Sequence, residues 1–256
     1  MNRAPAFNRD WCFFLDVDGT LLEFAEQPDA VAADADLRTL LRNLQAVSGG
    51  ALALISGRNV ADIDRMFAPL KLAVGGQHGI ERRDGAGIQH RHAAPVAKLR
   101  RAAQEILRKI DGHSGLILES KGATIALHYR QAPGLAGTAE AIMREALRAL
   151  GSEFELQEGK MLVEIKPGGK DKGGAIAEFM NEPPFCGRTP LFIGDDLTDE
   201  YGFAVVNSMG GLSMKVGEGK SAAVSRLDDA QAVRYWLGWV IEQHAGLTGR
   251  DLHGQA

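Results

Sequence analysis

The chain has 256 residues, and its 45% hydrophobic and 24% charged content is typical of a globular protein long enough for two domains. Its 33 acidic and 29 basic residues give a net charge of -4 with no long basic tract, which argues against nucleic acid or an anionic membrane surface as a partner. Because residues 1–10 lack an apolar signal core and no apolar run could span a membrane, we expect a cytoplasmic protein.

The first predicted element is a buried strand that ends in two aspartates. Apolar residues 12–15 run directly into Asp16, and Asp18 and Gly19 follow. In a parallel α/β sheet, ligands bind beyond the carboxyl ends of the strands, so both carboxylates would point into that crevice. Carboxylates this close repel each other unless a cation lies between them, and Mg²⁺ prefers such oxygen ligands. Taken alone, the residues are also typical of an acidic turn that caps a helix.

A second buried strand, predicted over residues 51–55, also ends in a polar turn. Ser56, Gly57 and Arg58 offer a hydroxyl, an unhindered backbone amide and a guanidinium. All three groups can donate hydrogen bonds to phosphate oxygens, although a plain helix N-cap by Ser56 is the alternative interpretation. The turn is therefore a second candidate for ligand binding.

Helices alternate with strands over the first 78 residues. One helix is expected to begin after Asp34 or Asp36, a second covers residues 59–67, and a short strand covers residues 72–74. Strands and helices that alternate in this way predict an α/β fold with a doubly wound parallel sheet.

The pattern changes over residues 79–167, where strands come in pairs. A hairpin is predicted over residues 80–91, and two amphipathic helices, each followed by a pair of strands, come after it. This order predicts a smaller α+β domain inserted into the first domain. Residues 1–78 and 168–256 would then form the catalytic core, and residues 79–167 would form a cap over its crevice.

Two more groups follow the return to the core. Lys172 lies at the start of a predicted helix, where the positive end of the helix dipole disfavours a cation unless an anion such as phosphate lies nearby. Compensation by Asp171 or by solvent is the alternative. A third buried strand, over residues 191–194, ends in Asp195 and Asp196. Because the first strand ends in acids at the same edge of the sheet, these residues predict further ligands for the same cation.

Together these groups predict the transfer of a phosphoryl group to an aspartate. Asp16 would attack phosphorus, while Asp18 would give a proton to the leaving alcohol and later take one from the attacking water. Three oxygen ligands would hold Mg²⁺: Asp16, the backbone carbonyl of Asp18, and Asp195. Three donors would bind the phosphate oxygens: Ser56, the Gly57 amide and Lys172. Direct metal contact by Asp196 or Asp199 is left open.

Four motifs resemble, in order, those of the haloacid-dehalogenase superfamily of Mg²⁺-dependent phosphohydrolases. They are Asp16-Val-Asp-Gly-Thr20, Ser56-Gly-Arg58, Lys172-Gly173 and Gly194-Asp-Asp-Leu-Thr-Asp199. Further stretches resemble the bacterial trehalose-6-phosphate phosphatase family: Leu54–Arg58, Gly76–Gly79, Leu118–Gly122, Ala126–Arg130, Met161–Pro167 and Gly194–Glu200. The resemblance extends from about Trp11 to Trp239.

The resemblance implies a Rossmannoid core of the haloacid-dehalogenase type with a C2-type cap. It also implies a small-molecule substrate, trehalose 6-phosphate, which would be hydrolysed to trehalose and phosphate in trehalose biosynthesis with Mg²⁺ as cofactor. The implied sugar contacts are Glu119, Lys121 and Glu164 in the cap, with Arg58 and His78 near the domain junction. His128 and Arg130 match the family as well, and we interpret them as structural.

Two other functions remain open at this point. The chain could be a phosphatase of the same superfamily that acts on another sugar phosphate, or a phosphomutase. It could also be a catalytically silent domain that binds a partner enzyme, although such domains usually lose one of the acids, and Asp16, Asp18 and Asp195 are all present. The oligomeric state is not predicted, and a monomer is the working assumption.

Overall fold

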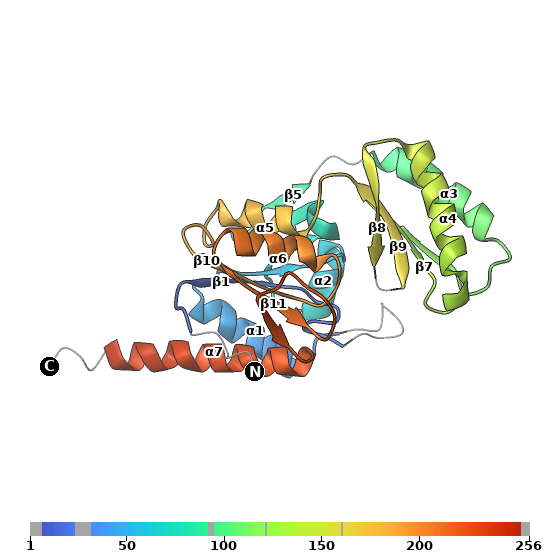
Figure 1. Cartoon of the computed structure of the whole chain (residues 1–256). Coiled ribbons are helices and arrows are strands. Elements are labelled where there is room, and N and C mark those ends of the chain that lie inside the picture. The colour runs from blue at the N-terminus through green and yellow to red at the C-terminus, as the bar shows by residue number, and fades with distance from the viewer. Residues whose placement is uncertain (1–6, 24–31, 92–94, 121, 160, 252–256) are drawn as a thin grey trace. The chain divides into compact units, whose positions relative to one another are not determined.

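The computed structural model describes residues 7–23, 32–91, 95–120, 122–159 and 161–251. The chain divides into two compact units, and both can be followed in Figure 1. The larger, called the core unit here, comprises Met1–His90, Lys172–Asp195 and Asp199–Ala256. The smaller unit comprises Arg91–Asp171 and Asp196–Thr198. Within the described part of the chain, no helix combines the length and the apolar character that a bilayer crossing requires.

The core unit is built on an eight-stranded sheet with the strand order β12-β11-β10-β1-β2-β3-β4-β5. Its strands are β1 (Trp11–Leu15), β2 (Leu52–Ile55), β3 (Ala73–Gly76), β4 (Glu81–Arg83), β5 (Gln89–Arg91), β10 (Thr189–Gly194), β11 (Leu212–Val216) and β12 (Ser225–Leu227). Every pairing from β12 to β3 is parallel. The carboxyl ends of these strands therefore meet at one edge.

Helices pack on both faces of this sheet (Figure 1). One face carries α1 (Ala35–Val47), α2 (Val60–Phe67) and α7 (Ala230–Asp251). The other face carries α5 (Lys172–Met180) and α6 (Asp199–Ser208). A mostly parallel sheet between two helical layers confirms the predicted doubly wound α/β class.

β1 lies between β10 and β2 and is buried on both faces. Trp11, Phe13 and Leu15 pack in the apolar cluster with α1, α2 and α7, whereas Cys12 and Phe14 pack in the cluster with α5 and α6. A parallel strand covered on both sides must be apolar at every position, which explains the unbroken apolar run in the sequence. Packing thus fixes the point at which β1 ends and Asp16 follows it at the carboxyl edge of the sheet.

The start of α1 resolves one alternative that the sequence left open. Asp34 is the N-cap, and its side chain accepts the backbone N–H of Leu37 at 2.7 Å. Its second oxygen pairs with Arg234 of α7 at 2.6 Å. The Leu37 amide first, and then Arg234, hold the pKa of Asp34 below its usual value. The cap therefore also ties α1 to α7.

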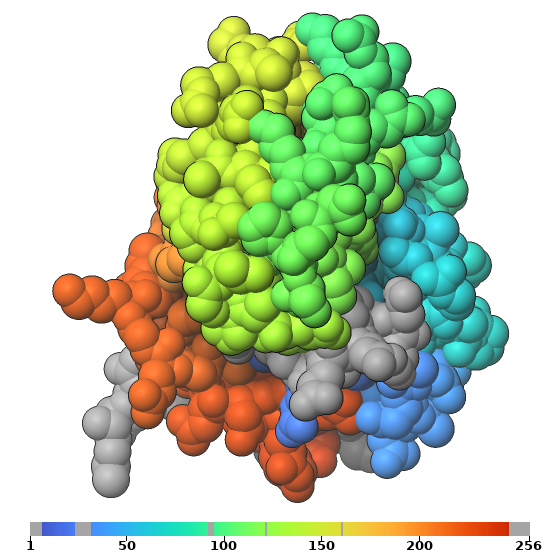
Figure 2. Space-filling model, turned by 90° about the vertical axis from the view of Figure 1, so that its right-hand side faces the viewer, coloured from blue at the N-terminus to red at the C-terminus, as the bar shows by residue number. Residues whose placement is uncertain are grey.

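The smaller unit has its own antiparallel sheet, with the strand order β6-β7-β9-β8. Its elements are α3 (Val96–Ile110), β6 (Ile117–Ser120), β7 (Ile125–His128), α4 (Ala136–Leu150), β8 (Phe154–Gly159) and β9 (Leu162–Pro167). Both helices pack on one face of this sheet in a separate apolar cluster. Their outer surface faces the viewer in Figure 2. The predicted α+β character of this part is present.

The hairpin β4–β5 belongs to the large sheet, which places the division between the units later than the sequence suggested. β4 pairs antiparallel with β3, with Gly76 opposite Glu81. The first division therefore falls after His90 and not after residue 78, and the chain returns to the core unit at Lys172. A hairpin turn signal predicts that two strands pair with each other, but it carries no information on the sheet they join.

Candidate active site

Asp16 and Asp18 leave β1 through a tight turn at the carboxyl edge of the large sheet. The backbone N–H of Asp16 donates to the carbonyl oxygen of Ile193 in β10 at 3.0 Å, so the first acid is still held by the sheet. Gly19 then donates to the carbonyl oxygen of Leu22 at 2.7 Å. Its φ is 87°, a left-handed conformation that glycine adopts without strain.

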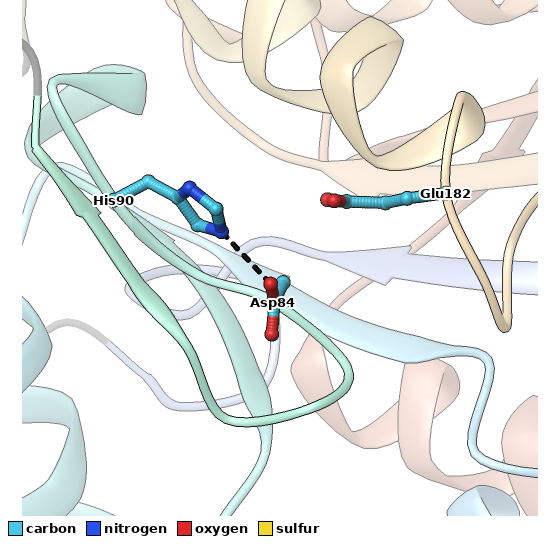
Figure 3. Close-up of side chains that lie close together, drawn as sticks. All are labelled: Asp84, His90 and Glu182. Atoms are coloured by element: carbon cyan, nitrogen blue, oxygen red, sulfur yellow. Dashed lines mark hydrogen bonds and ion pairs between the residues drawn. The ribbon is translucent and has the colours of Figure 1, made fainter.

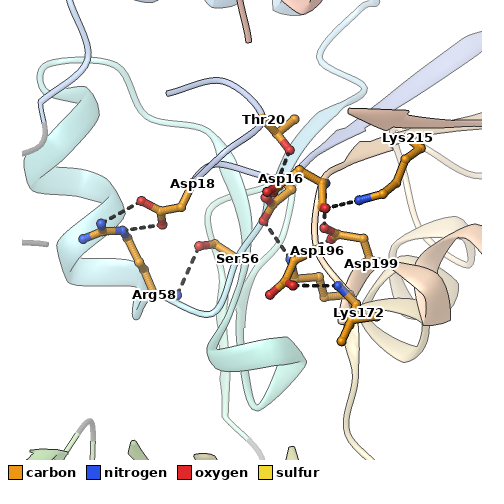
Figure 4. Close-up of polar contacts among 11 residues, drawn as sticks. Asp16, Asp18, Thr20, Ser56, Arg58, Lys172, Asp196, Asp199 and Lys215 are labelled. Atoms are coloured by element: carbon orange, nitrogen blue, oxygen red, sulfur yellow. Dashed lines mark hydrogen bonds and ion pairs between the residues drawn. The ribbon is translucent and has the colours of Figure 1, made fainter. Parts of the chain in front are cut away.

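Lys172, the first residue of α5, joins Asp16 to Asp199 (Figure 4). Its Nζ lies 2.7 Å from Asp16 Oδ1 and 2.6 Å from Asp199 Oδ1. The other oxygen of Asp199 accepts the backbone N–H of Asp195 at 2.9 Å. All three charged side chains are at most 6% exposed. Because a buried charge is unfavourable without a partner, these residues depend on one another.

The buried network of Asp16, Lys172 and Asp199 has more carboxylates than ammonium groups, so a further cation beside it would be favourable. Burial is the main cause that raises the pKa of Asp16; Asp199 and Asp195 raise it further, and Lys172 opposes them. For Lys172, burial alone would lower the pKa, but the carboxylates of Asp16 and Asp199 outweigh it and raise the pKa. Lys172 is therefore an ammonium, and a divalent cation beside Asp16 would favour the ionised carboxylate.

Oxygens of Asp16, Asp195 and Asp199 lie within 4.8 Å of one another. Such a set of carboxylates suits Mg²⁺. Asp199 accepts a hydrogen bond on each of its oxygens, which suits a residue that orients the ligands, while Thr20 donates to Asp195 Oδ1 at 3.4 Å. The predicted ligands Asp16 and Asp195 are thus brought together. The backbone carbonyl of Asp18 stays a prediction.

Asp18 pairs with Arg58 from the turn after β2. Arg58 Nε lies 2.6 Å from Asp18 Oδ2, and Nη2 lies 2.7 Å from Oδ1, which is a bidentate ion pair. The sequence assigned Arg58 to the substrate and Asp18 to proton transfer, and it did not predict their contact. The side chains of Arg58 and Asp18 are 16% and 29% exposed, so solvent reaches the pair.

Backbone hydrogen bonds join the turn that contains Ser56 and Arg58 to the turn after β3. The carbonyl oxygen of Ser56 accepts the N–H of His78 at 3.1 Å, and that of Arg58 accepts the N–H of Gln77 at 2.9 Å. Gln77, His78 and Gly79 have φ values of 48°, 55° and 91°. Consecutive left-handed residues are unfavourable for Gln and His and persist only where surrounding contacts impose them. Such strain is typical of functional sites.

Gly57 lies directly against the ring of His78. A Cβ at Gly57 would come within 2.8 Å of His78 Nε2, so only glycine allows this approach. The N-cap of α2 is Asn59, and the interpretation of Ser56 as a helix cap is therefore wrong. Instead, Ser56 Oγ accepts the backbone N–H of Arg58 at 3.1 Å. The predicted substrate residues of the core unit thus form one contiguous group.

Glu119 and Glu164, two predicted sugar contacts, lie in the sheet of the smaller unit. Thr124 Oγ1 donates to Glu164 Oε1 at 2.7 Å, and both side chains are buried. His128 Nε2 lies 2.9 Å from Glu119 Oε2, so His128, interpreted as structural, contacts a candidate ligand group. Lys121 lies outside the described residues. Thr124 had no predicted role, because its contact with Glu164 joins residues that are 40 positions apart in the chain.

The sequence also missed the residues that position Asp195. It left open whether Asp199 contacts the metal, and it did not predict that Asp199 contacts both Lys172 and the Asp195 amide. Lys215 of β11 donates from Nζ to the backbone carbonyl of Asp195. The four-residue spacing of Asp195 and Asp199 was the available signal, because the start of a helix can fold back on the turn before it.

A second group of potential metal ligands, Asp84, His90 and Glu182, lies in the core unit (Figure 3). These side chains already have partners: Asp84 Oδ1 accepts two backbone N–H groups of the β4–β5 turn, and Oδ2 lies 2.8 Å from His90 Nε2. Glu182 pairs with Arg82, whose guanidinium would repel a cation. These contacts stabilise the β4–β5 hairpin, and we do not assign a metal to the three residues.

Comparison with known proteins places the chain among phosphatases. The family model described as trehalose-phosphatase matches residues 14–231. A probable trehalose-phosphate phosphatase of Sinorhizobium fredii is 43% identical over 227 residues, which are 88% of this chain and 85% of that protein. The trehalose-6-phosphate phosphatase of Escherichia coli is 44% identical over 239 residues, which are 93% and 89% of the two chains.

A solved structure agrees with these matches. It is a crystal structure described as a trehalose-6-phosphate phosphatase related protein, with 26% sequence identity and a TM-score of 0.75. The alignment covers 91% of this chain and 98% of that one, so both units are included. The resemblance seen in the motifs is confirmed, and the chain belongs to the trehalose-phosphatase family.

Proposed function

We propose that the protein is a Mg²⁺-dependent phosphatase that hydrolyses trehalose 6-phosphate to trehalose and phosphate, a step of trehalose biosynthesis. The observation that carries the proposal is the buried contact of Lys172 with Asp16 and Asp199, next to Asp195. A carboxylate nucleophile, an ammonium for phosphate and oxygen ligands for a cation are what aspartyl phosphate chemistry needs. The family and the named relatives support the disaccharide as substrate.

Asp16 is the proposed nucleophile. Asp16, Asp195 and the backbone carbonyl of Asp18 would hold Mg²⁺, which when bound offsets the repulsion between an anionic nucleophile and an anionic ester. Asp16 attacks phosphorus, the bond from phosphorus to the sugar oxygen breaks, and the phosphoryl group remains on the carboxylate as an acyl phosphate. Three donors would bind the phosphoryl oxygens: Ser56 Oγ, the Gly57 N–H and Lys172 Nζ.

Asp18 is the proposed proton carrier. It gives a proton to the departing sugar oxygen and then accepts one from the water that hydrolyses the acyl phosphate, which regenerates Asp16. Both Asp18 oxygens accept from Arg58, so we propose that the substrate competes for Arg58 and releases Asp18. Ion pairs that solvent reaches contribute about 1 kcal/mol or less, so this exchange requires little free energy.

The smaller unit is proposed to be the cap that recognises the sugar. The carboxylates of Glu119 and Glu164 would accept hydrogen bonds from hydroxyl groups, and Lys121 would add a donor. Arg58 and His78 are the proposed sugar contacts from the core unit. A site that depends on such bonds rejects sugars that lack the matching hydroxyls. A cap also limits the water that reaches the acyl phosphate before the sugar has left.

Phosphate release from a panel of sugar phosphates tests the substrate. We expect kcat/KM for trehalose 6-phosphate to exceed that for glucose 6-phosphate by about a hundredfold, because the second ring adds several hydrogen bonds of about 1 kcal/mol each. Chelation of Mg²⁺ should abolish turnover, and added Mg²⁺ should restore it. Equal kcat/KM values for the two substrates would refute the substrate assignment. Without Mg²⁺-dependent turnover of any phosphate ester, the enzyme proposal itself would fail.

Gly194→Ala is expected to reduce turnover by disturbing Asp199. A Cβ at Gly194 would lie 2.3 Å from Asp199 Cγ, so the carboxylate that holds Lys172 and the Asp195 amide must move. Because a displacement of about 1 Å can lower a rate roughly a hundredfold, we expect kcat to fall by about ten- to a hundredfold. Steady-state hydrolysis of p-nitrophenyl phosphate, which needs no sugar contacts, measures this.

Gly238 in α7 provides the matched control. A Cβ there meets nothing within 4 Å, so Gly238→Ala should leave kcat unchanged and raise the melting temperature slightly, since alanine favours helices. If Gly194→Ala were as active as Gly238→Ala, Asp199 would not be needed to position Lys172 and Asp195.

A further inference from the structure

A polar row crosses all four strands of the smaller unit. The register places Glu119 opposite Ala126, Ala126 opposite Glu164, and Glu164 opposite Gln157. Residues directly opposite one another in a sheet point to the same face. With neighbouring strands about 4.8 Å apart, the row spans roughly 14 Å, a length along which a disaccharide can lie.

The row lies on the face that turns away from α3 and α4. Leu127 and Ile165, the sequence neighbours of row members, belong to the apolar cluster that includes both helices. Because side chains alternate along a strand, Ala126 and Glu164 point to the opposite face. On the face that the helices do not cover, the row therefore carries two carboxylates and a carboxamide, with the methyl group of Ala126 between the glutamates. Glu119 and Gln157 at the ends of the row are half-buried, whereas Glu164 and Ala126 are buried.

Gln157 differs from the two glutamates in its contacts. Thr124 donates to Glu164, and His128 contacts Glu119, so neighbours hold both carboxylates in place. Among the residues that the structure describes, the half-buried side chain of Gln157 makes no hydrogen bond. A partly buried amide has lost some of its contact with water, and an external partner would restore its hydrogen bonds.

We propose that Gln157 is a further sugar-binding residue whose carboxamide bonds hydroxyl groups of the ring that carries no phosphate. A carboxylate only accepts hydrogen bonds, whereas an amide both donates and accepts. Gln157 therefore offers a hydroxyl oxygen the donor that Glu119 and Glu164 lack. This inference rests on the proposed function, because it needs the sugar on the face of these glutamates.

Gln157→Ala tests the inference in the full-length protein. We expect kcat/KM for trehalose 6-phosphate to fall about tenfold, with kcat/KM for p-nitrophenyl phosphate within twofold of the wild-type value. Gln157→Glu keeps the shape but replaces both donors with an acceptor beside Glu164, so its loss should be at least as large. Unchanged melting temperatures would show that the loss lies in recognition and not in folding.

Glu158→Ala is the matched control for this experiment. Glu158 is the next residue of β8, lies on the other face of the sheet and is exposed, so its removal should leave both kcat/KM values unchanged. If the wild-type protein hydrolyses trehalose 6-phosphate and Gln157→Ala does so equally well, the inference alone is overturned. Equal losses on both substrates would also overturn it. If the wild-type protein does not use trehalose 6-phosphate, the proposed function fails together with the inference.

Discussion

Replacing Asp16 with asparagine is expected to remove turnover while the protein stays folded. The amide has nearly the same shape and keeps an oxygen that can accept from Lys172, and Lys172 retains Asp199 as a charged partner. However, it is a poor nucleophile towards phosphorus and a weaker ligand for a divalent cation. Loss of a residue that forms the covalent intermediate lowers kcat by about ten thousandfold or more. Phosphate release from trehalose 6-phosphate measures the effect.

Asp36→Asn is the matched control for Asp16→Asn. Asp36 is an exposed residue in the first turn of α1, so the same chemical change there should leave kcat unchanged. Mg²⁺-dependent turnover by Asp16→Asn within tenfold of the Asp36→Asn value would remove Asp16 from the role of nucleophile. The mechanism proposed above would then have no acyl phosphate.

Lys172→Met should lower the free energy of unfolding by about 3–5 kcal/mol and abolish turnover. Methionine fills similar space but leaves the buried carboxylates of Asp16 and Asp199 without their shared ammonium, and breaking a buried ion pair by removing one partner has effects of about this size. Denaturant-induced unfolding of the wild-type and variant proteins measures the difference. Turnover is lost because a phosphoryl oxygen would no longer find an ammonium.

Two further variants show whether burial of the charges is the cause. Lys109→Met removes a lysine that pairs with Glu145 on the surface, and it should change the free energy of unfolding by about 1 kcal/mol or less. The double variant Lys172→Met, Asp199→Asn also removes one of the two buried carboxylates that lack a partner in Lys172→Met. Its free energy of unfolding should therefore be higher than that of Lys172→Met alone. Equal destabilisation by Lys172→Met and Lys109→Met would contradict the account of the buried network.

The sequence predicted the parts of the site that follow buried strands. β1 and β10 are covered by helices on both faces and therefore read as unbroken apolar runs, so Asp16 and Asp195 could be placed at strand ends. Strand ends of a parallel sheet meet at one edge, which brings the two aspartates together. Lys172 could be assigned to the same site because a lysine at the start of a helix is unfavourable unless an anion lies nearby.

The contacts between turns could not be predicted in the same way. The bidentate pair of Asp18 and Arg58 joins the turns after β1 and β2, and it depends on side-chain orientation and not on spacing along the chain. The position of β4 and β5 in the large sheet depends on pairing with β3, which a local turn signal does not contain. The contacts of Asp199 with Lys172 and the Asp195 amide were missed for a related reason, since acidic residues are common in the first turn of any helix and do not by themselves indicate a partner.

The division between Asp171 and Lys172 has a consequence for how this protein can be re-engineered. The segment from Arg91 to Asp171 contains Glu119, Gln157 and Glu164, whereas every member of the Asp16–Lys172–Asp199 network lies outside it. A chimera that exchanges this segment would replace one candidate specificity element and keep the hydrolytic machinery, so the two properties are transplantable as separate pieces of one polypeptide.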